Sequence, residues 1–262
     1  MRFLIHFSYD GSYFHGYQTQ PGYRTIQEEL ENAATKINNG EKVKVVASGR
    51  TDKKVHAYHQ VAHLDMNVSI NPKQVKRAMN RYLPSDIHVF ETEEVSSDFH
   101  ARYYVISKTY EYHLNMGEYN PIRRNYCYQH NYKLDIEAMK KAITYFIGTH
   151  DFRAFVTENS IKDNCVRTIT NASITLDDYY KDEIVFTFEG NGFLRYQVRN
   201  MVGLLIKVGT GKIDYKLVKE ILDSKVRGKY GTTAKAEGLY LKNIVLRSWQ
   251  IKRLWYNFNR YI

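Results

Sequence analysis

The sequence is poor in cysteine and proline and contains no long hydrophobic run. Its 262 residues include two cysteines and four prolines. Two cysteines cannot build a disulfide scaffold, so a reducing compartment is the simpler interpretation. There is no stretch of about 18 apolar residues, so no membrane-spanning helix is expected. The apolar stretch at the start is broken by His6 and Ser8 and is too short and polar for a signal peptide. We therefore expect a cytoplasmic protein that has no membrane partner.

Positive charge and tyrosine are present in excess. There are 38 basic and 28 acidic side chains, for a net charge of +10, and 23 tyrosines. Hydrophobic residues make up 43% of the chain, which excludes disorder as its main state. Excess positive charge with many flat rings favours a nucleic-acid partner. Basic proteins without such a partner are also common, so composition alone leaves both interpretations open.

Hydrophobic periodicity predicts a similar order of elements in each half of the chain. In the first half we expect strands at 2–9, 43–47, 61–66 and 87–90, and helices that begin with a Thr25–Glu28 capping box and at Asn71-Pro72. In the second half we expect strands at 101–107, 109–116, 165–176, 183–189 and 239–246, and helices after Asp135, over 193–208 and after Asp214. The prediction is an α+β fold of two ferredoxin/RRM-like βαββαβ units, 1–105 and 106–262. They would share a mainly antiparallel sheet with helices on one side and a catalytic cleft between the units.

Common cofactor and metal motifs do not fit. Gly209-Thr-Gly211-Lys212 is not a phosphate-binding loop, because position 206 is Ile where such a loop requires Gly. His59 and His63 would lie about 13 Å apart on a strand that rises roughly 3.3 Å per residue, too far for one metal ion. We expect neither a metal nor a cofactor.

The segment from Ala47 to Ala57 carries the densest set of chemical groups. Asp52 is its only acid and stands beside Arg50, Lys53 and Lys54. Nearby positive charge favours the ionised carboxylate, which suits a nucleophile or base. The alternative is that Thr51-Asp52 only caps a turn.

This segment and several others resemble the tRNA pseudouridine synthase A family. Gly49-Arg-Thr-Asp52-Lys-x-Val-His-Ala57 is similar to the family's catalytic motif. The other similar segments follow in the family's order: 9–12, 16–18, 25–28, 83–87, 98–102, 108–112, 151–155, 192–194, 198–200 and 233–239. Each piece alone is weak, but the set is highly specific.

The resemblance implies an enzyme that converts uridine to pseudouridine without a cofactor or metal. Its expected substrate is the anticodon stem-loop of tRNA, at uridines 38, 39 and 40, and the expected assembly is a homodimer. Asp52 would be the nucleophile, attacking either the ribose or the base. Tyr110 would stack on the target base, and Arg199 would pair with Asp52 and keep it ionised.

The resemblance also implies RNA-binding residues. The flipped nucleotide and its surroundings would be held by Arg50, Arg24, Tyr17, His100, Arg102, Phe193 and Leu239, the last two lining the pocket. Several of these residues also have ordinary structural interpretations. Tyr110 lies in a tyrosine-rich strand and could only pack, Arg195 and Arg199 could form a solvated helix face, and Arg24 and Arg102 could be surface cations.

The chain departs from the family pattern at three positions. Lys54 replaces the usual Gly, which costs roughly 1 kcal/mol if that position has a positive φ. Tyr17 replaces a common Trp, and Gln197 a frequent Met. A paralogue acting on another RNA, a non-catalytic RNA-binding protein and an RNA chaperone therefore stay open as alternatives, although the usual RRM motif is absent. The tail 249–262 suits a dimer contact, a core cover or an RNA contact.

Overall fold

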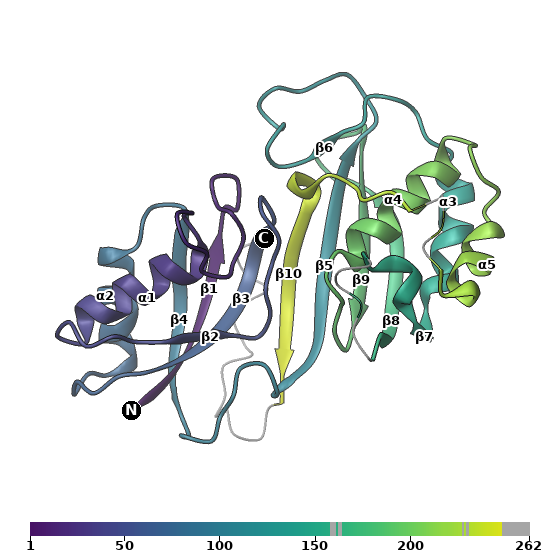
Figure 1. The fold of residues 1–262 in the computed structure, drawn as a ribbon. Coiled ribbons are helices and arrows are strands. Elements are labelled where there is room, and N and C mark those ends of the chain that lie inside the picture. Colours follow the sequence, from purple (N-terminus) through teal and green to yellow (C-terminus); the bar gives the residue numbers. More distant parts are fainter. Residues whose placement is uncertain (158–160, 162–163, 227, 229–230, 248–262) are drawn as a thin grey trace.

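The fold is one continuous mixed sheet of ten strands with helices packed against it (Figure 1). The computed structural model describes residues 1–262 except 158–160, 162–163, 227, 229–230 and 248–262. The tail 249–262 therefore lies outside the described residues. None of the helices in the described part of the chain has the length and apolar character needed to cross a bilayer.

The first half has the predicted βαββαβ order. Its elements are β1 (Arg2–Tyr9), α1 (Ile26–Ile37), β2 (Val45–Ala47), β3 (His56–Asp65), α2 (Pro72–Tyr82) and β4 (Ile87–Val95). The capping box is not where the sequence indicates one, because Thr25 makes no side-chain cap hydrogen bond. The Asn71 and Gln74 side chains instead form a reciprocal box at the start of α2.

The second half keeps the same order with additions. Its elements are β5 (Val105–Asn115), β6 (Tyr128–Gln129), α3 (Ile136–Ile143), β7 (Gly148–Asp151), β8 (Val166–Leu176), β9 (Glu183–Gly190), α4 (Gln197–Gly209), α5 (Leu217–Ser224) and β10 (Leu239–Leu246). Short 3₁₀ turns cover Thr144–Phe146, Phe152–Phe155 and Ala236–Gly238. The strands β6 and β7 were not predicted.

Two predicted elements of the second half are wrong in their bounds. Residues 101–104 form turns rather than a strand, so a single strand, β5, replaces the two expected runs. The helix predicted over 193–208 begins only at Gln197, because Tyr196 has a φ of 63°, which a right-handed helix does not allow.

The last strand of the chain joins the two halves. The sheet order is β4-β1-β3-β10-β5-β9-β8-β7, with β2 on β3 and β6 on β5. Thus β10 lies between β3 and β5 (Figure 1). It runs parallel to β3 and antiparallel to β5. Only the β10–β3 and β5–β6 pairs are parallel among the described strands, which confirms a mainly antiparallel sheet.

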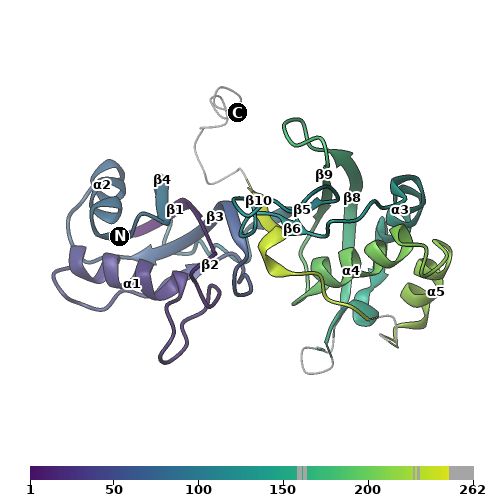
Figure 2. The ribbon, with the colours of Figure 1, turned by 90° about the horizontal axis from the view of Figure 1, so that it is seen from above.

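Each half has its own hydrophobic core. The first lies under α1 and α2, and the second under α3 and α4. Seen from above, α1 and α4 lie on the same side of the sheet (Figure 2). The strand β10 contributes to both cores, since Leu239 is buried in the second and Leu241 in the first. The two cores therefore meet where β3, β10 and β5 run side by side.

Candidate active site

The segment from Ser48 to Val55, called the catalytic loop below, leaves the sheet where the two halves meet. The strand β2 pairs with the C-terminal part of β3, at Leu64 to Ala62, and β10 pairs with its N-terminal part, at His56 and Ala57. The loop connects β2 to β3 and lies between these two partners of β3. Its last residue, Val55, is buried in the core of the second half. The chain thus brings the loop of one half against the other half.

The segment that follows β1 supports the middle of the loop. The hydroxyl groups of Tyr9 and Thr51 lie 2.8 Å apart, and the Thr51 carbonyl accepts a 3.1 Å hydrogen bond from the backbone N–H of Tyr17. Gly16 has a φ of 92°, and a Cβ atom there would lie 3.0 Å from the Thr51 carbonyl oxygen. Only a glycine fits so close to the loop in this backbone conformation.

The carboxylate of Asp52 faces two arginines that come from the second half. Arg199 Nη1 donates to Asp52 Oδ2 at 3.2 Å, and Arg195 Nε lies 3.8 Å from Asp52 Oδ1. The side chain of Arg199 is only 14% exposed, whereas that of Arg195 is 63% exposed. Arg199 Nε also donates to the carbonyl of Ala234 at 2.8 Å, which orients the guanidinium. These two arginines are therefore not a solvated helix face, and Arg195 lies before α4 rather than on it.

Burial raises the pKa of Asp52 above its ordinary value, and the nearby Arg199 and then Arg195 only partly oppose this. The sequence suggested the opposite direction, because three cations are its neighbours in the chain. In the structure Arg50, Lys53 and Lys54 are exposed, and Lys53 Nζ lies 3.0 Å from His15 Nε2. The direction differs because solvent screens these exposed charges, while desolvation acts directly on the carboxylate.

Tyr110 lies at the junction of the two cores. It is on β5 and packs against residues of both. Its ring meets that of Phe193 edge-on, with centroids 5.1 Å apart. Burial first, then the nearby Tyr9 and the negative charge of Asp52, raise the pKa of the Tyr110 hydroxyl, so it stays protonated at neutral pH. An aromatic ring with a neutral hydroxyl therefore lies within electrostatic reach of the Asp52 carboxylate.

Two of the predicted RNA-binding cations are free to meet a ligand. Arg50 and Arg102 are exposed, and within the described residues neither side chain has a hydrogen bond or ion pair. His100 is half-buried, and its ring centroid lies 4.3 and 4.8 Å from those of Tyr103 and His63.

Three other predicted RNA-binding residues make hydrogen bonds or packing contacts inside the protein. Arg24 donates to Glu29 and to both oxygens of Asp86 at 2.7–2.9 Å, and its guanidinium lies over the Phe14 ring. Tyr17 is only 2% exposed, because its ring packs into the first core. Leu239 is 6% exposed and belongs to the second core. In this conformation the Tyr17 ring is withdrawn from the surface, and its contact with RNA stays a prediction.

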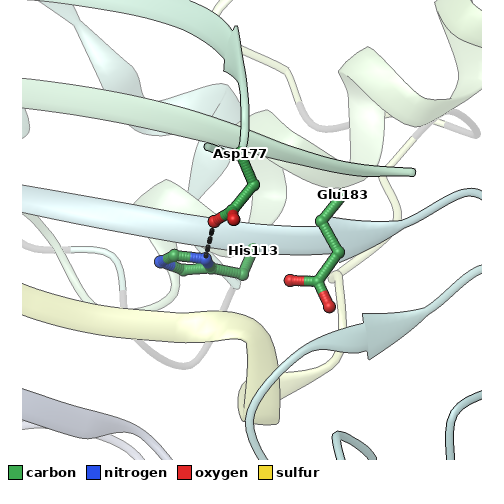
Figure 3. Close-up of side chains that lie close together, drawn as sticks. All are labelled: His113, Asp177 and Glu183. Atoms are coloured by element: carbon green, nitrogen blue, oxygen red, sulfur yellow. Dashed lines mark ion pairs between the residues drawn. The ribbon is translucent and has the colours of Figure 1, made fainter. Parts of the chain in front are cut away.

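Among the residues that the structure describes, one group of side chains has the types and spacing that could bind a metal ion. His113 on β5, Asp177 after β8 and Glu183 at the start of β9 place ligand atoms within 4.8 Å of one another (Figure 3). Both oxygens of Glu183 are, however, held by Arg123, at 3.1 Å from Nε and 2.7 Å from Nη2. A metal ion would have to displace or face this cation, so the group does not fit a metal site. The histidines at 56, 59 and 63 are not gathered either: His59 pairs with His6 at 2.9 Å, and His63 accepts from the Ala101 N–H.

The chain is similar to known proteins over most of its length. A family model described as tRNA pseudouridine synthase matches residues 5–104 and 142–245. The chain is 44% identical over 245 residues to the tRNA pseudouridine synthase A of Streptococcus agalactiae serotype Ia, covering 93% of this chain and 95% of that protein. The chain belongs to the tRNA pseudouridine synthase family.

A second relative matches nearly the whole chain, whereas the similarity to a solved structure is weak. The tRNA pseudouridine synthase A of Streptococcus agalactiae serotype III is 42% identical and covers 99% of both chains. A solved structure of a Cbf5-Nop10-Gar1 complex is 14% identical with a TM-score of 0.31, covering 78% of this chain and 54% of that chain, too low a similarity to support an argument. In this member of the tRNA pseudouridine synthase family, the matched ranges include Asp52 and Arg199 but not Tyr110.

Sequence reasoning missed residues that support the loop. Lys108 on β5 donates to the Ser48 carbonyl at 3.0 Å. His56 lies between Asp10 and the carbonyl of Asn125, at 3.1 and 2.8 Å. Both residues are inside the motifs that the sequence singled out, but their partners lie far along the chain and leave no local pattern.

Proposed function

We propose that the protein is a tRNA pseudouridine synthase that acts on the anticodon stem-loop at uridines 38, 39 and 40, with Asp52 as the nucleophile. The observation that carries this proposal is the pairing of Arg199 with the Asp52 carboxylate, which is only 17% exposed and lies within electrostatic reach of Tyr110, in a chain of this family. A carboxylate that is shielded from water and oriented by a cation is suited to attack an electrophilic carbon. Its ionised form is weakly hydrated and therefore reactive.

The reaction needs only groups that this chain supplies. The bond between ribose C1′ and N1 of the uracil breaks, the base turns, and a bond between C1′ and C5 forms. C5 loses its proton, which Tyr110 would help to move, and N1 gains one, so the number of protons is unchanged. Asp52 forms the transient bond, to the ribose or to the base, and leaves again. Tyr110 stacks on the uracil and holds it in the site while it turns, because a neutral ring can pack on the base without repelling it.

The basic surface would bind the RNA around a flipped nucleotide. The target base must leave its stack to reach a buried carboxylate. Arg50, Arg102 and His100 lie outside the core and are suited to phosphate contacts. Phe193, in edge-on contact with Tyr110, would line the pocket together with Leu239. Arg24 would act indirectly, through the segment that it holds.

Both halves of the chain are needed in this proposal. Residues 1–105 supply Asp52, and residues 106–262 supply Tyr110 and Arg199 and would also carry the contact of a cytoplasmic homodimer. Sedimentation equilibrium tests the dimer, with an expected mass twice the chain mass of 30.9 kDa. A monomer that stays fully active would contradict this part of the proposal.

The decisive experiment is to incubate the protein with unmodified tRNA and map pseudouridine at each position. We expect product at uridines 38, 39 and 40 with the wild type and none with Asp52→Asn, which keeps the side-chain shape. Asp65→Asn is the matched control, since Asp65 pairs with Arg2 away from the loop. Tight tRNA binding without product would point instead to a non-catalytic RNA-binding protein, and product elsewhere in the RNA would point to a paralogue with another target.

A further inference from the structure

The lysine on β5 reaches across the junction to the start of the catalytic loop. Lys108 and Tyr110 are two residues apart on a strand, so their side chains lie on the same face of the sheet. Lys108 Nζ donates to the Ser48 carbonyl at 3.0 Å, across 60 residues of sequence. It thereby links the strand that carries Tyr110 to the loop that carries Asp52.

A residue of the first half, Gln60, binds the start of the catalytic loop as well. Gln60 on β3 donates from Nε2 to the Gly49 carbonyl at 3.1 Å and accepts from the Ser48 hydroxyl at 2.8 Å. Two successive carbonyl groups, those of Ser48 and Gly49, are therefore fixed from different halves. Lys108 thus joins the Ser48 end of the loop to the second half, as Arg199 does at Asp52.

Placing an ammonium group here is costly. Burial, followed by the positive charge of Arg102, lowers the pKa of Lys108 to about 8. No carboxylate pairs with Lys108 among the described residues, and its hydrogen-bond partner is a backbone carbonyl. A partly desolvated cation that has no counter-ion destabilises the fold, whatever its position contributes to function.

The glycine at position 49 leaves room for this group. A Cβ atom at Gly49 would lie 2.5 Å from Lys108 Nζ, and its next neighbour would be Lys108 Cε at 3.9 Å. Gly49 is thus needed for the lysine rather than for an unusual backbone angle. An alanine at this position would push aside the end of a flexible side chain and leave the rest of the packing intact.

We propose that Lys108 is a positioning residue for the reaction: its ammonium group anchors the Ser48–Gly49 end of the catalytic loop to the strand that carries Tyr110. The inference rests on the proposed function. Without this anchor the loop shifts relative to the second half, and Asp52, four residues after Ser48, no longer meets Tyr110 and Arg199 in the reactive arrangement. A misplacement of about 1 Å can lower a rate on the order of a hundredfold.

The test compares Lys108→Met with Gly49→Ala, which displaces the ammonium group without removing it. We expect each variant to lower kcat by roughly tenfold to a hundredfold, with the dissociation constant for tRNA within about twofold of the wild type. Lys242→Met is the matched control, because Lys242 lies on the neighbouring β10 and pairs with Glu111. It should keep the wild-type kcat. In the Lys108→Ala background, which leaves space for the new methyl group, Gly49→Ala should cause no further loss.

Amide hydrogen exchange gives a readout that does not depend on activity. We expect Lys108→Met to speed exchange at residues 48–52 and to leave the sheet unchanged. If wild-type protein forms no pseudouridine, the proposed function fails, while the exchange data still decide whether Lys108 anchors the loop. An unchanged kcat in Lys108→Met overturns the inference. So does weakened tRNA binding with normal kcat, which would mark a phosphate contact, or a general loss of stability without a change confined to the loop.

Discussion

Arg199 and Asp52 are 147 residues apart in the sequence, yet Nη1 of the arginine lies 3.2 Å from Oδ2 of the aspartate. One residue comes from a helix of the second half, and the other from a loop of the first. The contact joins the halves at the carboxylate that we propose as the nucleophile, so in this proposal the relative position of the two halves affects the chemistry.

Replacing Arg199 by methionine should move the acid limb of activity to higher pH. Asp52 must be ionised to act as the nucleophile, and Arg199 is the strongest of the groups that lower its pKa. Without that cation the carboxylate takes up its proton at a higher pH, so kcat/KM falls earlier as the pH decreases. The measurement is a profile of kcat/KM against pH. Arg195→Met is the control and should shift the limb less, since Arg195 is farther away and mostly exposed. Equal shifts would contradict the assignment.

Replacing Asp52 by asparagine should abolish turnover and make the free energy of unfolding less dependent on pH. The pKa of Asp52 is raised in the folded state, so ionisation favours the unfolded chain, and wild-type stability decreases as the pH rises through the folded pKa. Below the ordinary pKa of an aspartate both states are protonated, and this cost is absent. Urea unfolding at pH 4 and pH 7 should therefore show that the stability of Asp52→Asn relative to the wild type increases with pH.

Asp65→Asn is the matched control for the urea series, and its stability relative to the wild type should change with pH in the opposite direction. The hydrogen bond from Arg2 lowers the pKa of Asp65, so Asp65→Asn should be less stable than the wild type, by an amount that grows with pH and is reduced by solvent screening. If Asp52→Asn behaves like Asp65→Asn, burial is not the dominant influence on Asp52.

Two arginines of the first half should respond differently to the same substitution. Arg50→Gln should weaken tRNA binding. It should also reduce the slope of log binding constant against log salt concentration by about one, because an exposed cation that meets a phosphate releases about one counterion. Arg24→Gln should instead lower the free energy of unfolding by about 1 kcal/mol, since it loses partly exposed hydrogen bonds to Asp86 and Glu29. Binding measured at several salt concentrations and urea unfolding distinguish the two. A stability loss in Arg50→Gln would place it among the structural arginines.

Lys54→Gly should stabilise the protein. Lys54 has a φ of 65°, a conformation that costs a side chain with a Cβ atom roughly 1 kcal/mol and costs glycine nothing. The backbone N–H of residue 54 keeps its hydrogen bond to the Phe14 carbonyl in either case. The measurement is urea unfolding, with an expected gain of about 1 kcal/mol. Lys54→Ala removes the charge and keeps the strain, so a similar gain in that variant would show that charge, not backbone conformation, is responsible.

Local patterns were enough to predict most of the elements and the family. Strand alternation placed β1, and helical spacing placed α1 and α2, because burial on one face is written into neighbouring residues. The order of short motifs identified the family, and Asp52 stood out as the one acid of its loop. The roles of Asp52, Tyr110 and Arg199 stay predictions that the proposed assay tests.

The tertiary structure decided what depends on distant residues. It placed β10 between β3 and β5, turned Arg195 and Arg199 toward Asp52, withdrew Tyr17 into the core and bound Arg24 to Asp86. It also reversed the expected direction of the Asp52 pKa. The sequence by itself determined which groups are available and which local elements carry them. Desolvation, ion pairing and the position of Lys108 are set by separations through space, and only the packed sheet brings these groups within a few ångströms.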